Sequence, residues 1–300
     1  MKIFSTARYV LPLPEGHRFP MEKYARLSQR VTAELGARHP VCEPPAADDS
    51  DLLRAHTSDW VTRVSSGALT REEIRRIGFP WSSEMVERSR RSAGATMAAC
   101  RAAIEDGMAV NLAGGTHHAF ADRGEGYCVF NDTAVSARAM QSEKRARRVL
   151  VIDCDVHQGN GTAAIFRDDP SVFTFSIHGA KNFPFRKEKS DLDVDLPDGS
   201  GDSEYLEALS AGLAEVTIRF PGPDLAFYVA GADPWEGDRL GRLKVSQAGL
   251  AARDRLVLGA LRKGGIPVAV TMAGGYGRPI DGTVQIHFET VRLAAEMSGL

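Results

Sequence analysis

Residues 149–161 of the 300-residue chain read Val149-Leu150-Val151-Ile152-Asp153-Cys154-Asp155-Val156-His157-Gln158-Gly159-Asn160-Gly161. The first four residues are apolar and mostly β-branched, which predicts a strand buried on both faces, and the glycines that follow end it. Because side chains alternate across a strand, we expect Asp153, Asp155 and His157 on one side of it. Cys154 and Val156 are expected on the other side. This buried strand therefore brings two carboxylates and an imidazole to one place.

A bound metal ion explains this cluster most simply. Open α/β sheets bind ligands at the carboxyl edge of their strands, and crowded like charges repel unless a cation or protons lie between them. Two oxygen donors and one nitrogen donor suit zinc or another divalent first-row ion. The sequence thus predicts a metal centre at the end of the strand.

The same stretch allows two other interpretations. One is a strand followed by an acidic turn and a helix cap, with no ligand. The other is a dinucleotide site, since Gly-Asn-Gly-Thr-Ala-Ala at 159–164 fits the pattern G-x-G-x-x-A. A pyrophosphate at this turn would meet Asp153 and Asp155, and no acidic residue follows the next expected strand to hold a ribose. We therefore favour the metal.

Composition limits the domain organisation and the partners. Nothing resembling a linker divides the chain, so we expect one domain spanning residues 1–300. The formal charge of −2 gives no electrostatic reason to expect nucleic acid or an anionic membrane as a partner. The 4 cysteines are scattered, which predicts free thiols in a reducing compartment. Without a signal-like segment or a membrane-length apolar run, we expect a cytoplasmic protein; the oligomeric state stays open.

Apolar strands alternate with helices along the chain. Strands are predicted at residues 2–4, 109–112, 149–152, 172–177, 224–230 and 267–272. Helices are predicted at 21–36, 52–65, 71–77, 82–106, 132–141, 162–166, 203–219, 247–262 and 281–297. Residues 40–51 are expected to be irregular and residues 179–202 to form a long functional loop. Such alternation is typical of an α/β fold with a parallel sheet.

Three further side chains are interpreted as structural. His56 and Trp60 have helical spacing and are expected to pack in the core. His287 has no ligand-like neighbour in sequence, so we expect it at the surface or at an interface.

Four strand ends carry chemically active side chains: His117 and His118; Asp153, Asp155 and His157; Asp233; and Tyr276. Asp155, His157 and Asp233 would supply three ligands and leave one position open, which is the arrangement of a catalytic zinc. The metal would activate water, the histidine pair would take and return its proton, and the tyrosine would stabilise an oxyanion. These parts describe amide hydrolysis, and no G-x-S-x-G elbow or P-loop competes with them.

The motifs in this order resemble the histone deacetylase family of the arginase-deacetylase superfamily. The resemblance rests on His117-His118-Ala119, on residues 153–161, on Ala230-Gly231-Ala232-Asp233-Pro234 and on Gly274-Gly275-Tyr276. Asn182-Phe183-Pro184-Phe185 and the chain length are similar to the class IV branch and its bacterial relatives. The resemblance implies a three-layer α/β/α domain with an eight-stranded parallel sheet. It also implies Zn²⁺, or Fe²⁺ in its place, at Asp155, His157 and Asp233.

The resemblance assigns a role to each remaining group. His118 would be the general base and then the acid that protonates the leaving amine, while His117 would act electrostatically, oriented by Asp153. Asn160 stands behind His118, where some family members have an aspartate. Tyr276 would polarise the acyl carbonyl.

The family also implies two structural monovalent cation sites and a substrate tunnel. A potassium ion would be held by Asp153, Asp155, His157, Ser176 and Ile177, and a second monovalent cation by Phe166, Asp169 and Val172. The tunnel would be lined by Gly126, Tyr127, Gly274, Leu240 and either Phe183 or Phe185. A narrow apolar slot suits the methylene stem of a lysine.

The leading hypothesis is a zinc-dependent deacylase acting on acylated lysine or a similar acylated amine, with the length of the acyl chain left open. An acetylpolyamine amidohydrolase would use the same ligands, and acidic groups at the tunnel mouth would favour it. A ureohydrolase on the same fold would need two manganese ions and more aspartates. A catalytically silent module that only binds acyl-lysine is the alternative outside enzymes.

Overall fold

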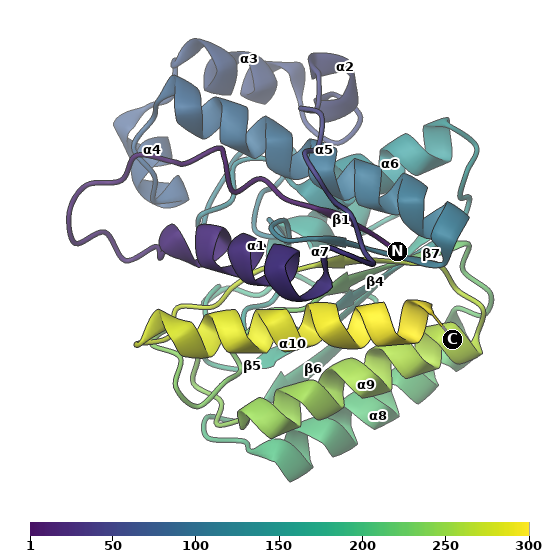
Figure 1. Cartoon of the computed structure of the whole chain (residues 1–300). Helices are drawn as coiled ribbons and strands as arrows, with labels where there is room; N and C mark the ends of the chain where they lie inside the picture. The colour runs from purple at the N-terminus through teal and green to yellow at the C-terminus, as the bar shows by residue number, and fades with distance from the viewer. Residues whose placement is uncertain (300) are drawn as a thin grey trace.

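A parallel sheet of eight strands lies at the centre of the computed structural model, which describes residues 1–299 (Figure 1). The strands are β1 (Lys2–Phe4), β2 (Val41–Cys42), β3 (Met108–Asn111), β4 (Val149–Asp153), β5 (Val172–Gly179), β6 (Leu192–Leu196), β7 (Leu225–Val229) and β8 (Val268–Thr271). Their order across the sheet is β2-β1-β3-β8-β7-β4-β5-β6, and every neighbouring pair is parallel. The predicted eight-stranded parallel sheet is confirmed.

Helices cover both faces of this sheet and complete three layers. They are α1 (Glu22–Leu35), α2 (Asp49–Leu52), α3 (Ser58–Ser66), α4 (Arg71–Ile77), α5 (Ser83–Asp106), α6 (Asp132–Ser142), α7 (Asn160–Phe166), α8 (Asp202–Arg219), α9 (Gln247–Lys263) and α10 (Ile280–Ser298). In Figure 1, α8, α9 and α10 lie in the lower part of the view and α2 to α6 in the upper part; α1, drawn above α10, packs on the same core as α8, α9 and α10. The α/β/α architecture expected from the family resemblance is therefore present.

The central strand β4 fills the cores on both faces. Leu150 and Ile152 pack in the core beneath α8, α9 and α10, whereas Val149 and Val151 pack in the core beneath α5 and α6. All four side chains are at most 2% exposed. Burying each one stabilises the fold by about 1.5–3 kcal/mol relative to leaving it in water. This burial fixes the position of β4, and hence of the polar residues that follow it.

Two strands and one helix boundary differ from the prediction. β2 has two residues and β6 lies inside 179–202, a segment predicted to be a loop. β6 is an edge strand that pairs only with β5, and its Leu-Asp-Val-Asp-Leu alternation reflects one covered face. The helix predicted at 52–65 begins later, as α3, because the Thr57 hydroxyl accepts the amide hydrogen of Trp60 and starts the helix there. The prediction that residues 40–51 are irregular is also wrong, since they contain β2 and most of α2.

Of the three side chains interpreted as structural, two lie where they were predicted and one does not. Trp60 and His56 are buried, as predicted. The prediction that His287 lies at the surface is wrong. Most side chains of α10 are buried, and His287 is only 1% exposed. All 4 cysteines lie within the described residues and are unpaired, as predicted. Within residues 1–299, no helix is both long and apolar enough to cross a membrane.

The burial of His56 predicts a pH-dependent stability. Burial lowers the pKa of this imidazole to about 4, so it is neutral in the folded chain. The unfolded chain therefore binds the extra proton between the usual pKa of about 6.5 and pH 4, and the stability falls as the pH falls through this range. We expect the loss to be about 3 kcal/mol.

Urea unfolding of the wild type and of His56→Gln at pH 7.5 and 4.5 measures this effect. The glutamine oxygen can still accept the amide hydrogen of Asn131, which His56 accepts at 2.9 Å. The variant should lose less stability on acidification than the wild type. Equal losses in the two proteins would contradict the assignment.

Candidate active site

The functional side chains follow four adjacent strands. His117 and His118 follow β3, Asp155 and His157 follow β4, Asp233 follows β7, and Tyr276 follows β8. These strands are consecutive in the sheet order β3-β8-β7-β4. Because the strands are parallel, their carboxyl ends lie at one edge, and the segments after them converge there.

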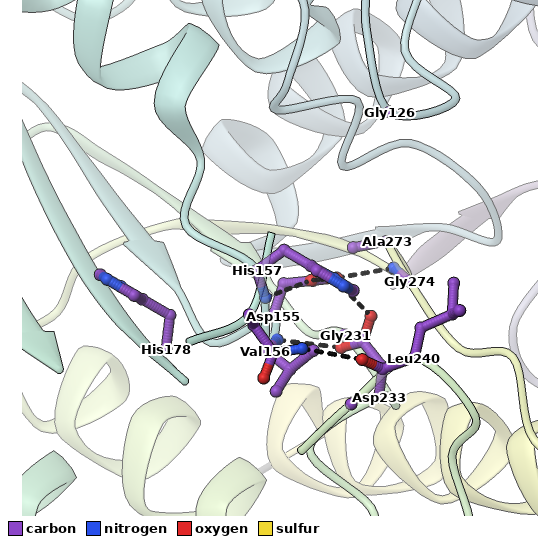
Figure 2. Close-up of polar contacts among 12 residues, drawn as sticks. Gly126, Asp155, Val156, His157, His178, Gly231, Asp233, Leu240, Ala273 and Gly274 are labelled. Carbon is purple, nitrogen blue, oxygen red and sulfur yellow. Dashed lines mark hydrogen bonds and ion pairs between the residues drawn. The ribbon is translucent and has the colours of Figure 1, made fainter. Parts of the chain in front are cut away.

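Asp155, His157 and Asp233 surround one point (Figure 2). His157 Nδ1 lies 2.9 Å from Asp155 Oδ1 and 3.2 Å from Asp233 Oδ2. The second oxygen of each carboxylate is held by the backbone: Val156 N–H donates to Asp233 Oδ1 at 2.9 Å, and Gly274 N–H donates to Asp155 Oδ2 at 2.8 Å. One oxygen from each aspartate is thereby oriented toward the imidazole.

The donor set of this triad fits a divalent metal ion. The atoms that could act as ligands all lie within 4.8 Å of one another, and all three residues are buried. Asp233 Oδ2 is buried and makes no hydrogen bond among the described residues, although the His157 imidazole lies 3.2 Å away. An oxygen left in this way is costly unless an ion or a proton compensates it. Two carboxylates and one imidazole match the ligands that zinc accepts.

The pKa shifts within the triad also indicate a site that favours a cation. Burial and the charge of Asp155 raise the pKa of Asp233 to about 7. Burial opposes protonation of His157, but its hydrogen bond to Asp155 and the nearby charge of Asp233 prevail and raise its pKa to about 10. A proton on His157 then occupies the space between the aspartates, where a metal would compete for the same donors.

The local backbone after β4 differs from the prediction. The strand ends at Asp153, so residues 154–157 are not strand; Cys154 and Val156 nevertheless pack in the core while Asp155 meets His157, as predicted. Two side-chain turns follow the strand: Asp153 Oδ1 accepts Asp155 N–H at 3.1 Å, and Asp155 Oδ1 accepts His157 N–H at 3.0 Å. Asp155 and His157 meet through these turns.

The two adjacent histidines have different partners. His117 Nδ1 lies 2.6 Å from Asp153 Oδ2, and His118 Nδ1 lies 2.8 Å from Asn160 Oδ1. Burial disfavours the charged form of both, but Asp153 prevails at His117 and raises its pKa to about 9. His118 has no such carboxylate, so burial and the neighbouring imidazoles hold its pKa well below the usual value. At neutral pH, His117 is charged and His118 is a free base.

Asn160 has a second partner that the sequence did not indicate. Its Nδ2 donates to Glu125 Oε1 at 2.5 Å, so Glu125, Asn160 and His118 form a chain of hydrogen bonds. A carboxylate that accepts from an amide polarises it and makes its carbonyl oxygen a better acceptor. Glu125 therefore acts on His118 through Asn160.

Tyr276 is held on a loop fastened at several points. Its N–H donates to Asp238 Oδ2 at 2.5 Å and its carbonyl accepts from Arg239 Nε at 2.8 Å. Behind the loop, the buried Lys23 Nζ donates to Ala273 O at 3.1 Å and lies 5.4 Å from the Tyr276 ring centroid. Burial and the two metal-site aspartates raise the pKa of the Tyr276 phenol well above its usual value, so it remains a donor.

Glu125, Asp238 and Lys23 are thus the positioning residues that the sequence analysis missed. Asp238 lies in the Gly-Asp-Arg-Leu segment next to Leu240, whose N–H it accepts at 2.8 Å. For Glu125 and Lys23 the sequence offers no signal, because their contacts join segments far apart in the chain.

A cavity of ≈ 490 Å³ leads to these groups. Gly126, Tyr127, Leu240 and Phe183 line it, together with His118, His157 and Tyr276. A Cβ added to Gly126 would lie 2.7 Å from His118 Cδ2, so the glycine allows this wall to approach the imidazole. The Phe183 ring stands at 84° to His118 with centroids 4.9 Å apart, whereas Phe185 is 87% exposed at the mouth.

The residues expected around the two monovalent cations lie at opposite ends of β5: Ser176 and Ile177 near its carboxyl end, and Val172 at its start. Ser176 is paired with Asp153 across β5 and β4, and Ile177 follows it. Phe166, Asp169 and Val172 share the turn between α7 and β5: Phe166 O accepts from Asp169 N, and Asp169 O accepts from Val172 N. The Asp169 carboxylate is already paired with Arg138 at 2.5 Å. Both potassium sites stay predictions.

Comparison with known proteins identifies the family. The family model described as histone deacetylase domain matches residues 17–290. Histone deacetylase 2 of Arabidopsis thaliana is 32% identical over 271 residues, which cover 87% of this chain and 70% of the plant protein. An uncharacterized protein of Picosynechococcus sp. is 45% identical over 291 residues, covering 96% of each chain. The crystal structure of a histone deacetylase homologue from Aquifex aeolicus shares the fold, with a TM-score of 0.82 at 24% identity over 99% of this chain and 84% of the other.

The fold and the family match together define an α/β enzyme of the deacetylase class. The chain belongs to the histone deacetylase family, as its motifs predicted, and the match extends over most of its length.

The close approach of Gly274 to the triad predicts that this glycine is essential for metal binding. A Cβ at this position would lie 2.7 Å from Asp155 Oδ2 and still closer to Asp233. We expect Gly274→Ala to bind zinc at least tenfold more weakly than the wild type, measured by titration of the metal-free protein with a chromophoric zinc competitor. Gly259→Ala is the matched control, because nothing lies within 4 Å of its added Cβ. Equal zinc affinities in all three proteins would contradict this prediction.

Proposed function

We propose that this chain is a zinc-dependent deacylase that hydrolyses the amide bond of an acylated lysine or a similar acylated amine. The observation that supports it most is the meeting of the buried triad Asp155, His157 and Asp233 with a neutral His118 and a protonated Tyr276 at one cavity. Family membership supports the deacetylase class. The proposal extends to residues 1–300 as one catalytic domain, with structural potassium and a cytoplasmic location as further predictions.

Asp155, His157 and Asp233 would hold the metal. A zinc ion bound there supplies Lewis-acid chemistry, which polarises a carbonyl and makes water a better nucleophile; Fe²⁺ would serve in the same way.

The two histidines divide the proton chemistry. His118 Nδ1 faces Asn160, so Nε2 is the nitrogen that accepts a proton from water and returns it to the leaving amine. His117 stays charged through Asp153 and favours negative charge on the reacting carbonyl. A neutral base beside a fixed cation suits both halves of the reaction.

The remaining residues orient the substrate. The Tyr276 hydroxyl would donate a hydrogen bond to the acyl oxygen as negative charge develops there. Phe183, Gly126 and Leu240 would surround the methylene stem of the amine and exclude water. This arrangement holds the amide next to the base.

Metal dependence is the first test. The purified protein should hydrolyse a fluorogenic acetyl-lysine peptide, lose turnover after dialysis against a chelator, and regain it with Zn²⁺ or Fe²⁺. Asp155→Asn should stay inactive after metal is added back. Turnover by protein shown to be metal-free would contradict the mechanism, and peptide binding without turnover in the metal-loaded protein would indicate the silent binding module.

Removal of the Tyr276 hydroxyl tests the oxyanion role. We expect Tyr276→Phe to lower kcat by roughly 10²–10³-fold, which is the usual effect of losing one such donor. Its zinc content should equal that of the wild type, because Tyr276 is not among the three ligands. Wild-type rates in the variant would refute the role.

The Glu125–Asn160–His118 chain makes a separate prediction. Glu125→Gln removes the charge that polarises Asn160, and we expect kcat to fall by roughly threefold to tenfold with little change in KM. In an Asn160→Asp background, the aspartate contacts His118 directly, so the same Glu125→Gln change should no longer lower kcat. If Glu125→Gln has the same effect in both backgrounds, Glu125 does not act through Asn160.

A further inference from the structure

The mouth of the active-site cavity is basic. Four residues that line it have cationic side chains, Arg75, Arg76, Lys181 and Arg242, whereas Glu125 is the one acidic residue among the lining groups of the described chain. Arg75 and Arg76 lie on α4, Lys181 follows β5, and Arg242 belongs to the loop after β7. Three segments far apart in sequence therefore place positive charge around one opening.

Two of these cations are already paired. Arg76 Nη2 lies 2.8 Å from Glu72, and Arg242 Nη1 lies 3.2 Å from Asp198. Both ion pairs are exposed to solvent, so each is weak, and an anionic ligand could compete for the arginine.

Arg75 and Lys181 have no carboxylate within 4.0 Å anywhere in residues 1–299. The Glu125 carboxylate is directed inward, since it accepts from Asn160 Nδ2. The rim therefore has a net positive charge even though the whole chain has a formal charge of −2.

The rim also presents aromatic surface. Phe185 is 87% exposed and its ring stands at 84° to that of Phe183, with centroids 6.3 Å apart. An exposed aromatic ring next to unpaired cations suits a ligand with two parts: an apolar stem that lies inside the cavity, and an anionic part that stays at the rim.

We propose that this rim selects acylated amines that carry carboxylates close to the acylated stem, in the first instance an acyl-lysine within an acidic peptide. This inference rests on the proposed function of the site. It excludes acylated polyamines as preferred substrates, because their free amines would meet Arg75 and Lys181 at the mouth. The shared chemistry is a carboxylate beside the acylated side chain, whether the carboxylate belongs to a peptide or to a free amino acid.

The test compares three acetyl-lysine peptides of equal length, flanked by aspartate, alanine or lysine, with acetylspermidine and with an acetyl-lysine that has only its own α-carboxylate. At low salt we expect kcat/KM to be roughly tenfold higher for the acidic peptide than for the basic one, and to converge at 0.5 M salt. A preference that extends to the free amino acid identifies a small-molecule source of the carboxylate. A preference for flanking aspartates alone identifies a peptide.

Charge reversal locates the effect. Arg75→Glu combined with Lys181→Glu should remove or invert the preference and leave kcat for the alanine peptide within about twofold of wild type. Arg71→Glu, on the same helix but not among the residues lining the cavity, should leave the preference intact. Equal rates for acidic and basic peptides, or a preference that survives reversal of Arg75 and Lys181, would overturn the proposal.

Fluorescence anisotropy with the same labelled peptides separates this inference from the proposed function. If the metal-loaded protein turns over none of the substrates, the deacylase proposal fails. Tighter binding of the acidic peptide, lost on charge reversal, would still support the rim. Equal binding of all three peptides would reject it.

Discussion

The structure depends on two carboxylates buried against each other. Asp155 and Asp233 follow different strands, and both are almost completely removed from solvent. Their repulsion must be offset, and the fold does so with backbone amides of Val156 and Gly274 and with the imidazole of His157. The remaining oxygen of Asp233 lies 3.2 Å from the His157 imidazole but makes no hydrogen bond in the described chain, so a bound cation would compensate it more fully. The sheet edge, the glycine at 274 and the turns after β4 all serve this one arrangement.

The same low-dielectric pocket separates the two neighbouring histidines. One carboxylate, Asp153, is enough to keep His117 charged, and its absence behind His118 keeps that ring neutral. Asn160 orients His118 through a hydrogen bond but carries no charge. The charge of Glu125 acts on His118 indirectly, through its hydrogen bond with Asn160. Two identical side chains, adjacent in sequence, thus receive different protonation states from their partners.

The sequence predicted the parts governed by local pattern. The apolar run before Asp153 and the glycine-rich ends of the other strands were enough to predict a parallel sheet and the edge where its polar groups meet. Contacts between distant segments were beyond reach: a two-residue strand such as β2 has no periodicity, and the burial of His287 depends on how α10 lies on the sheet. Glu125 and Lys23 looked like ordinary charged residues, because only the folded chain brings them to Asn160 and to the Tyr276 loop.

A zinc-edge anomalous diffraction experiment on crystals of the zinc-loaded protein tests the central claim most directly. The account predicts one strong peak between Asp155, His157 and Asp233, at bonding distance from one atom of each. A peak elsewhere, or no peak in crystals that contain stoichiometric zinc, would contradict the claim that these three side chains form the metal centre.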